Sequence, residues 1–198
     1  IALALREDQD ALTQYFYLRR NIVTARVEVG TSVELYAVVV HTAAFSQDGS
    51  KQKHIDTFKE EIGRLDAAGA LVIAGGDLNT IPPNAQKKGG PGDEFEGNAC
   101  TDEEFQADDY TEEVNWLRAL YRDYAPAIDT LTYAANESDF FTHTTKSDIP
   151  FTHKLDYLFT NIDTVWVDGY VHKEEMGYGR TRLSDHAAVS ATVSVEGR

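Results

Sequence analysis

Residues 70–80 read ALVIAGGDLNT, an apolar run that ends in two glycines and then presents a carboxylate and an amide two residues apart. The apolar run predicts a buried strand, and the Ile81-Pro82-Pro83 sequence after it predicts a turn. If the chain stays extended, Asp77 and Asn79 point to the same side and offer two oxygen ligands at a strand end. Asp and Asn are also common in ordinary turns, where they bond to nearby backbone, so this stretch alone leaves both interpretations open.

The composition is that of a folded, acidic chain. Its 198 residues, 42% of them hydrophobic and 11% aromatic, suffice for one substantial core. The 33 acidic residues against 18 basic ones give a formal charge of -15. This charge argues against tight binding to a polyanion unless metal ions offset it, and it suits a site that collects divalent cations.

Cysteine usage and apolar runs narrow the protein class further. The single cysteine, Cys100, cannot form an intramolecular disulfide, and no spacing of Cys and His resembles a zinc site. No apolar run reaches the ~18 residues of a membrane span, and no secretory signal is visible. We therefore expect a soluble protein without a transmembrane segment, and its compartment, cytoplasmic or secreted, stays open.

The residues before Asp77 predict two strands, a helix and a third strand. Residues 22–29 have apolar odd positions, typical of a half-buried strand, and residues 33–40 are nearly all apolar, which predicts an inner strand buried on both faces. Helical spacing over about residues 50–68 predicts a helix between the strand that ends at His41 and the strand that ends at Asp77. Strand, helix and strand in this order predict a crossover that brings His41 beside Asp77.

The rest of the chain continues a single predicted domain, 1–198. Apolar periodicity is lost over about residues 84–110, which are Gly-rich and acidic, and we interpret this stretch as a surface insertion. Helical spacing resumes from Val114 to Tyr124. Later strands are predicted at residues 140–144, 155–160, 165–171 and 187–195.

Polar residues also stand at three other predicted strand edges. These are His41-Thr42, Lys154-Leu155-Asp156-Tyr157 and Leu183-Ser184-Asp185-His186. Each is weak evidence alone, because a single histidine is more often structural than catalytic. The remaining histidines are interpreted as structural: His54, His143, His153 and His172.

Taken together in chain order, these three edges and Gly76-Asp77-Leu78-Asn79 resemble the endonuclease/exonuclease/phosphatase superfamily, over about residues 23–195. The resemblance implies an α/β fold, a four-layer α/β/β/α sandwich of two mainly antiparallel or mixed sheets. It also implies metal-dependent hydrolysis of phosphate esters, above all phosphodiesters. The implied cofactor is Mg²⁺, or Mn²⁺ or Ca²⁺ in its place.

The resemblance also implies a role for each matching residue. Asp77 and Asn79 look like the pair that positions the attacking water and the phosphate near the metal, and Asp185 looks like a second acidic member of the metal shell. The implied metal ligands are therefore Asp77, Asn79 and Asp185.

The two histidines of the motifs carry the implied proton chemistry. His186 resembles the histidine that contacts the phosphate or acts as general base, and Asp156 resembles the carboxylate that orients it. His41 resembles the histidine that donates to a phosphate oxygen or protonates the leaving group. Lys154 occupies a position that is often basic in relatives, and we assign it no chemistry. The implied substrate-binding residues are His41, Asn79 and His186.

The physical logic agrees with these roles. A phosphodiester repels hydroxide, so its hydrolysis near neutral pH needs a cation that offsets charge and a base that takes a proton from water. Clustered carboxylates hold Mg²⁺ through one or two oxygens plus waters. A histidine paired with a carboxylate has a fixed tautomer and raised basicity, which suits proton transfer.

The resemblance also implies an N-terminal half that these residues do not contain. Relatives carry an Asn and a metal-binding Glu in an N-terminal half, and the residues before Val23 are too few for it; Glu7 lies in no motif and is unassigned. We expect this chain to be the C-terminal two-thirds of such a domain, incomplete at the N-terminus, with a missing N-terminal segment of the same protein as a partner. We further expect a weakened metal site and low activity in this fragment alone.

Two classes of function remain in competition. The first is a Mg²⁺-dependent phosphoesterase with a phosphate-ester substrate, either a nuclease or a small-molecule or lipid phosphodiesterase; nucleic acid is disfavoured by the charge of -15. The alternative is a catalytically incomplete fragment or binding module that keeps the same fold.

Overall fold

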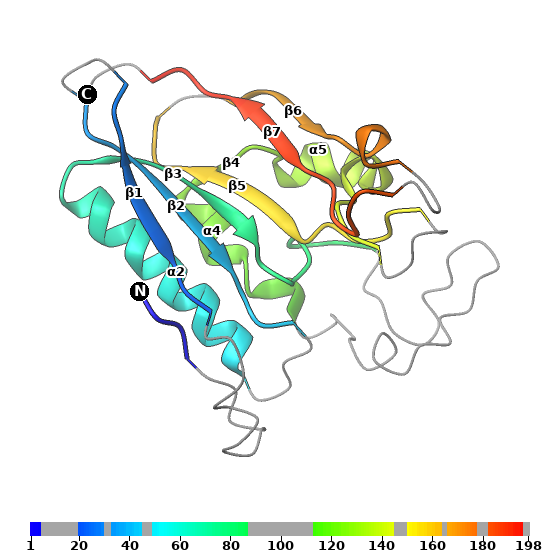
Figure 1. Ribbon diagram of the computed structural model, residues 1–198, viewed down its shortest axis with the longest axis horizontal. Helices are drawn as coiled ribbons and strands as arrows, with labels where there is room; N and C mark the ends of the chain where they lie inside the picture. Colours follow the sequence, from blue (N-terminus) through cyan, green and yellow to red (C-terminus); the bar gives the residue numbers. More distant parts are fainter. Residues whose placement is uncertain are drawn as a thin grey trace.

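The computed structural model describes residues 1–4, 20–29, 33–44, 49–86, 113–144, 150–163, 166–177 and 182–195, and Figure 1 shows their arrangement. Most of the predicted acidic insertion, as well as Glu7 and Cys100, lies outside these ranges. The elements in chain order are β1 (Val23–Val27), β2 (Leu35–His41), α2 (Ser50–Ala67), β3 (Leu71–Asp77), η1 (Glu113–Asn115), α4 (Arg118–Asp123), β4 (Ala125–Pro126), α5 (Thr130–Ala135), η2 (Glu137–Phe140), β5 (Asp156–Thr160), β6 (Val167–Val171), η3 (Glu174–Met176) and β7 (Val189–Thr192).

Within the described ranges, the main sheet has five strands in the order β1-β2-β3-β5-β4. Strands β2 and β3 are parallel, and α2 connects them, so the predicted crossover is confirmed. Strand β5 runs antiparallel to β3 on its other side. The register pairs His41 with Asp77 and Asp77 with Asp156, which places three predicted site residues in one row across the sheet.

One face of this sheet packs against α2 and α4. Alternate residues of the central strands, such as Val38 and Val72, meet Phe58 of α2 and Leu120 of α4 in a continuous core. All four side chains are fully buried, and burial of such a side chain stabilises the fold by about 1.5–3 kcal/mol each. Helix α2 ends where predicted, because Gly69 adopts a left-handed φ of 83° just after it.

The two glycines before Asp77 allow the strands on either side to approach β3. A Cβ atom at Gly75 would collide with the carbonyl oxygen of Tyr157 in β5, and one at Gly76 would collide with the carbonyl oxygen of Val40 in β2. Gly76 also has a φ of 132°, which a side chain opposes. Glycine is therefore needed here to hold the row of site residues together.

The second sheet consists of β6 and β7, which pair antiparallel. Val193 and Val195, just after β7, pack against Leu35 and Leu71 on the face of the main sheet away from α2. Figure 1 shows β7 following the course of β5. The fold is thus mixed α/β, with a helical layer and two stacked sheets, and the predicted sandwich class is confirmed.

Two predictions about burial in the first strands were wrong. Val23 and Val27 in β1 lie on the predicted apolar face, yet they are 61% and 36% exposed, and Val39 in β2 is 54% exposed. Residues 23–27 form a strand as predicted, but the described part of the chain covers this face of the sheet only toward β3 and β5. On the opposite face, Thr24 of β1 donates a hydrogen bond to Glu61 of α2.

Three predicted elements differ in extent. The helix predicted from Val114 to Tyr124 is divided into η1 and α4. Residues 141–144 follow η2 as a bridging segment rather than a strand, because they bond to separate segments on each side. The last strand spans Val189–Thr192 only. None of the described helices combines the length and the apolar character needed to cross a membrane.

Candidate active site

The site is built on the row formed by His41, Asp77 and Asp156, at the ends of three adjacent strands. Paired residues of a sheet point to the same side, so these side chains share the face away from α2. Nε2 of His41 lies 3.2 Å from Oδ2 of Asp77. The Asp77 side chain is mostly buried, whereas 60% of the His41 side chain is exposed, so the row runs from the surface inward.

Asp77 and Asn79 lie together because of a turn and not because of strand alternation. Strand β3 ends at Asp77, and Asn79 has a left-handed φ of 47°. Its backbone N–H donates to Oδ1 of Asp77 at 2.8 Å, and its Nδ2 donates to Oδ2 of Asp77 at 3.0 Å and to the carbonyl of Thr42 at 3.1 Å. These bonds engage the amide nitrogen of Asn79 and leave its Oδ1 as the oxygen that can serve a ligand.

His186 joins the row through Asp156. Its Nδ1 lies 2.8 Å from Oδ2 of Asp156, and its Nε2 lies 3.8 Å from Oδ2 of Asp77. Burial by itself would lower the pKa of His186, but the hydrogen bond to Asp156 and the nearby carboxylate charges outweigh burial and raise that pKa to about 8. His186 in the metal-free chain is therefore mainly an imidazolium at neutral pH.

The pKa of Asp77 is lowered, in contrast to that of His186. Burial pushes its pKa upward, but the hydrogen bond from His41 and the charge of His186 push it down further, and the net shift is below the ordinary value. Asp77 therefore remains a carboxylate throughout the neutral range. A mostly buried carboxylate beside two imidazoles is an arrangement that can accept a proton or hold a cation.

Thr142 holds the backbone at Asp156, a role that the sequence patterns did not indicate. Its hydroxyl is fully buried and accepts hydrogen bonds from the backbone N–H groups of Leu155, at 2.9 Å, and Asp156, at 3.1 Å. Lys154 is also buried, and its Nζ donates to the carbonyl of Asp156 at 2.8 Å. Burial lowers the pKa of Lys154 to about 7.

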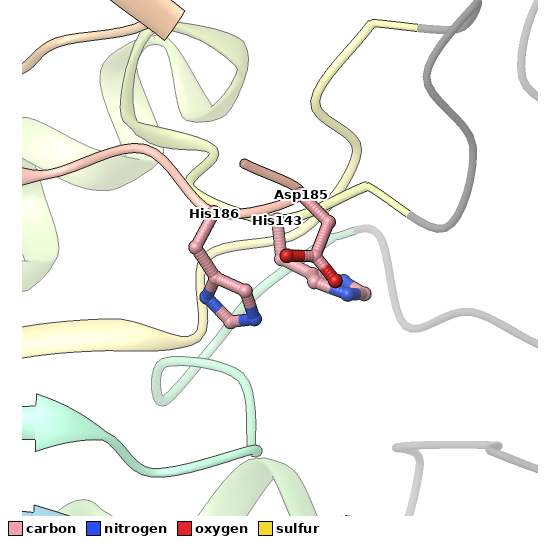
Figure 2. A group of neighbouring side chains, drawn as sticks. All are labelled: His143, Asp185 and His186. Atoms are coloured by element: carbon pink, nitrogen blue, oxygen red, sulfur yellow. The ribbon is translucent and has the colours of Figure 1, made fainter. Parts of the chain in front are cut away.

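His143 and Asp185 lie beside His186, as Figure 2 shows. The rings of His143 and His186 are 4.6 Å apart between centroids. Burial and the neighbouring His186 lower the pKa of His143. His143 was interpreted as structural from sequence; its position depends on a bridge to a segment far along the chain, and no local pattern marks it.

The other three histidines make hydrogen bonds away from this cluster. His54 bonds to the backbone of Ala4 and Ala43, and Nδ1 of His153 bonds to the hydroxyl of Thr152. His172 bonds to Glu175 and Ser190 near the second sheet.

The donor atoms fit a divalent cation. Asp77, Asp156 and His186 each offer one ligand atom, and these atoms lie within 4.8 Å of one another. Of the metal ligands expected from sequence, Asp77 belongs to this group and Asn79 hydrogen-bonds to Asp77, whereas Asp185 is grouped with His143 and His186. Carboxylate and amide oxygens at Asp77 and Asn79 are the ligand types that Mg²⁺ prefers.

Comparison with known proteins identifies the fold. No family model and no curated protein matches the sequence. An AP endonuclease from Archaeoglobus fulgidus matches in structure with 12% identity, over 98% of this chain and 72% of its own, at a TM-score of 0.52. A truncated TDP2 from Caenorhabditis elegans matches with 12% identity, over 96% of this chain and 63% of its own, at a TM-score of 0.50.

The catalytic domain of Xenopus laevis APE2 matches with 16% identity, over 87% of this chain and 55% of its own, also at a TM-score of 0.50. All three are endonuclease/exonuclease/phosphatase proteins, and this chain has their fold, as the motifs predicted. The chain spans between 55% and 72% of the length of these structures.

Proposed function

We propose that this chain is the main part of a metal-dependent hydrolase of phosphate esters, and of phosphodiesters in particular. The observation that carries the proposal is the row of His41, Asp77 and Asp156 on three adjacent strands, continued through Asp156 to His186. Two imidazoles, two carboxylates and an amide oxygen at one sheet edge supply both the cation ligands and the proton donors that phosphate ester hydrolysis needs.

A hard divalent cation, Mg²⁺ in the first place, is the proposed cofactor. Asp77 and Asn79 would hold it, and Asp185 or Asp156 would complete the acidic shell. When bound, the cation would supply positive charge that offsets the charge of the phosphate oxygens. The carboxylate of Asp77 is kept ionised by its neighbours, so it is ready for this role at neutral pH.

His186 and His41 are the proposed proton donors. In the metal-free chain His186 has a pKa of about 8 and carries a proton at neutral pH, which favours donation from Nε2 to a phosphate oxygen over the role of general base. Asp156 holds the ring through Nδ1. His41 is the more exposed of the two and can donate a proton to the leaving-group oxygen. Asp77 and Asn79 orient the attacking water, and the carboxylate of Asp77 accepts its proton.

The test is hydrolysis with Mg²⁺ by this chain and by the longest natural polypeptide that contains it. Plasmid DNA, an aryl phosphodiester, an aryl phosphomonoester and sphingomyelin distinguish the substrate classes. Asp77→Asn and His186→Asn are expected to lower kcat/KM by about 10²–10⁴-fold, because each removes a group that acts on the reacting atoms. His172→Asn is the matched control, because His172 bonds to Glu175 and Ser190 away from the cluster.

The outcomes are distinct. Activity that persists in Asp77→Asn at the level of the control would refute the mechanism. Activity only in the longer polypeptide would support the expectation that this chain holds an incomplete metal site. The net charge of -15 leads us to expect the small diester or the lipid, rather than DNA, as the better substrate.

The second candidate, an incomplete fragment or binding module, is favoured by one observation. Val23 and Val39 are opposite one another in the β1–β2 register and are 61% and 54% exposed. They lie on the sheet face that carries His41, beside the part that Val193 and Val195 cover. We propose that a further apolar segment of the same protein covers them; Val39→Thr would then destabilise the longer polypeptide but not this chain, and equal effects on both would contradict the idea.

A further inference from the structure

His143 is placed beside His186 by a short bridging segment. The carbonyl of Thr142 accepts a hydrogen bond from the backbone N–H of Ala187 at 2.7 Å, and the N–H of Thr144 donates to the carbonyl of Asp185 at 3.0 Å. These bonds pair His143 with His186 in an antiparallel bridge. Residues paired in this way point to the same side, which explains the contact between the two rings.

Three potential ligand atoms converge at this bridge. His143, Asp185 and His186 each offer one such atom, and the atoms lie within 4.8 Å of one another (Figure 2). Nδ1 of His143 is buried and makes no hydrogen bond within the described ranges of the chain. A buried ring nitrogen without a hydrogen-bond partner costs free energy, and a cation bound to Nδ1 of His143 would give this atom a partner.

Asp156 holds the ring of His186 in place. Its Nδ1 bonds to the carboxylate of Asp156 at 2.8 Å, which directs Nε2 away from Asp156 as the remaining ring nitrogen. A carboxylate behind a histidine is the usual arrangement behind a metal-binding imidazole, because it fixes the tautomer and strengthens the ligand. The Asp156 and His186 pair is therefore preorganised for a metal as well as for a phosphate.

We propose that His143, Asp185 and His186 form a site for a divalent transition metal of the zinc or cobalt class. Two imidazoles and one carboxylate prefer such borderline ions, whereas Mg²⁺ prefers oxygen ligands like those at Asp77 and Asn79. The proposal does not depend on the proposed hydrolysis, although the two share His186 and can share Asp185.

The spacing of the three ligand atoms is compatible with zinc. Zinc bound at about 2.0–2.1 Å in a tetrahedron holds its ligand atoms about 3.3 Å apart, and the three atoms lie within 4.8 Å of one another. Asp185 is exposed, and its side chain can rotate while its backbone stays bonded to Thr144. A fourth ligand position would remain for water or for a phosphate oxygen.

The experiment measures zinc binding by the metal-free chain, by calorimetry and by competition with a chromophoric chelator, in the presence of excess Mg²⁺. We expect one equivalent of Zn²⁺ to bind and Mg²⁺ not to displace it. Co²⁺ in place of Zn²⁺ should give the visible absorption of a site with nitrogen and oxygen ligands.

Variants locate the ion. His143→Asn and Asp185→Asn are expected to weaken zinc binding at least about tenfold, while His172→Asn keeps it within about twofold. Asp185 is exposed, so its substitution tests the site without risk to the core, and circular dichroism checks the fold of His143→Asn.

Three results would overturn the proposal. They are no zinc binding by the unsubstituted chain, undiminished binding by Asp185→Asn, and loss of binding in Asp77→Asn but not in folded His143→Asn. The last result would assign the ion to the group of Asp77, Asp156 and His186 instead. Since the readout is binding, a failure of phosphate ester hydrolysis would leave this result intact.

Discussion

Replacement of Asp156 by asparagine should remove the raised pKa of His186 in the metal-free chain. In the unsubstituted chain that pKa stands at about 8 against an ordinary value of 6.5. At 1.36 kcal/mol per pKa unit, the environment favours the imidazolium by about 2 kcal/mol. The amide introduced at this position would keep the burial of the ring but lose the charge, so we expect the pKa of His186 to fall to 6.5 or below.

The same change predicts a pH-dependent loss of stability. Because the folded pKa of His186 is higher than the unfolded one, its stabilisation is fully present below pH 6.5 and is lost as the pH rises through about 8. Asp156→Asn should therefore cost about 2 kcal/mol more of the free energy of unfolding at pH 6 than at pH 9. The hydrogen bond itself adds a loss that does not depend on pH.

The assay is an NMR titration of the imidazole nitrogens with a chelator present, together with urea unfolding at the two pH values. Asp185→Asn is the matched control, because the charge of Asp185 is the weakest of the influences that raise this pKa. A pKa that stays near 8 in Asp156→Asn, or that falls equally in Asp185→Asn, would refute the assignment of Asp156 as the carboxylate that orients His186.

Three further substitutions test the scaffold. Gly76→Ala should cost at least about 3 kcal/mol in chemical unfolding, since the new Cβ meets a carbonyl of β2, whereas Gly63→Ala, in the middle of α2, should cost little or stabilise; similar effects would contradict the packing argument. Lys51→Met should cost about 3–5 kcal/mol because it strips Glu113 of a buried partner at 2.9 Å, and the loss should shrink in a double variant with Glu113→Leu; a loss below about 1 kcal/mol would be inconsistent with a buried pair. Tyr121→Phe should leave stability unchanged or raise it by about 1 kcal/mol in thermal unfolding, because the buried hydroxyl makes no hydrogen bond within the described residues; a marked loss would reveal a partner.

Local patterns predicted the centre of this molecule well. The apolar run before Asp77 and the helical spacing from residue 50 to 68 specify the elements. The order strand, helix, strand then predicted that His41 and Asp77 are neighbours, and the register pairs them. The motifs around Asp156 and His186 predicted a pair that the structure joins at 2.8 Å. The fold expected from these motifs is the fold observed.

Other features lay beyond any local pattern. The alternation of Val23 and Val27 predicted a strand correctly, but which face is covered depends on elements that pack from elsewhere. Asn79 meets Asp77 through a left-handed turn, although an extended chain also predicted their proximity. The approach of His143 to His186 depends on a single bridge between distant segments.

The amino-acid sequence by itself determined the order of the strands and helices up to Asp77 and the identity of the residues at the strand ends, because hydrophobic periodicity is a property of residues close together in the chain. Only the tertiary structure decided which of those residues lie close enough to share a cation, that Asp185 is grouped with His143, and that a valine face beside His41 is left exposed. These outcomes depend on contacts between segments far apart in the chain, and such contacts leave no periodic signal in the residues that make them.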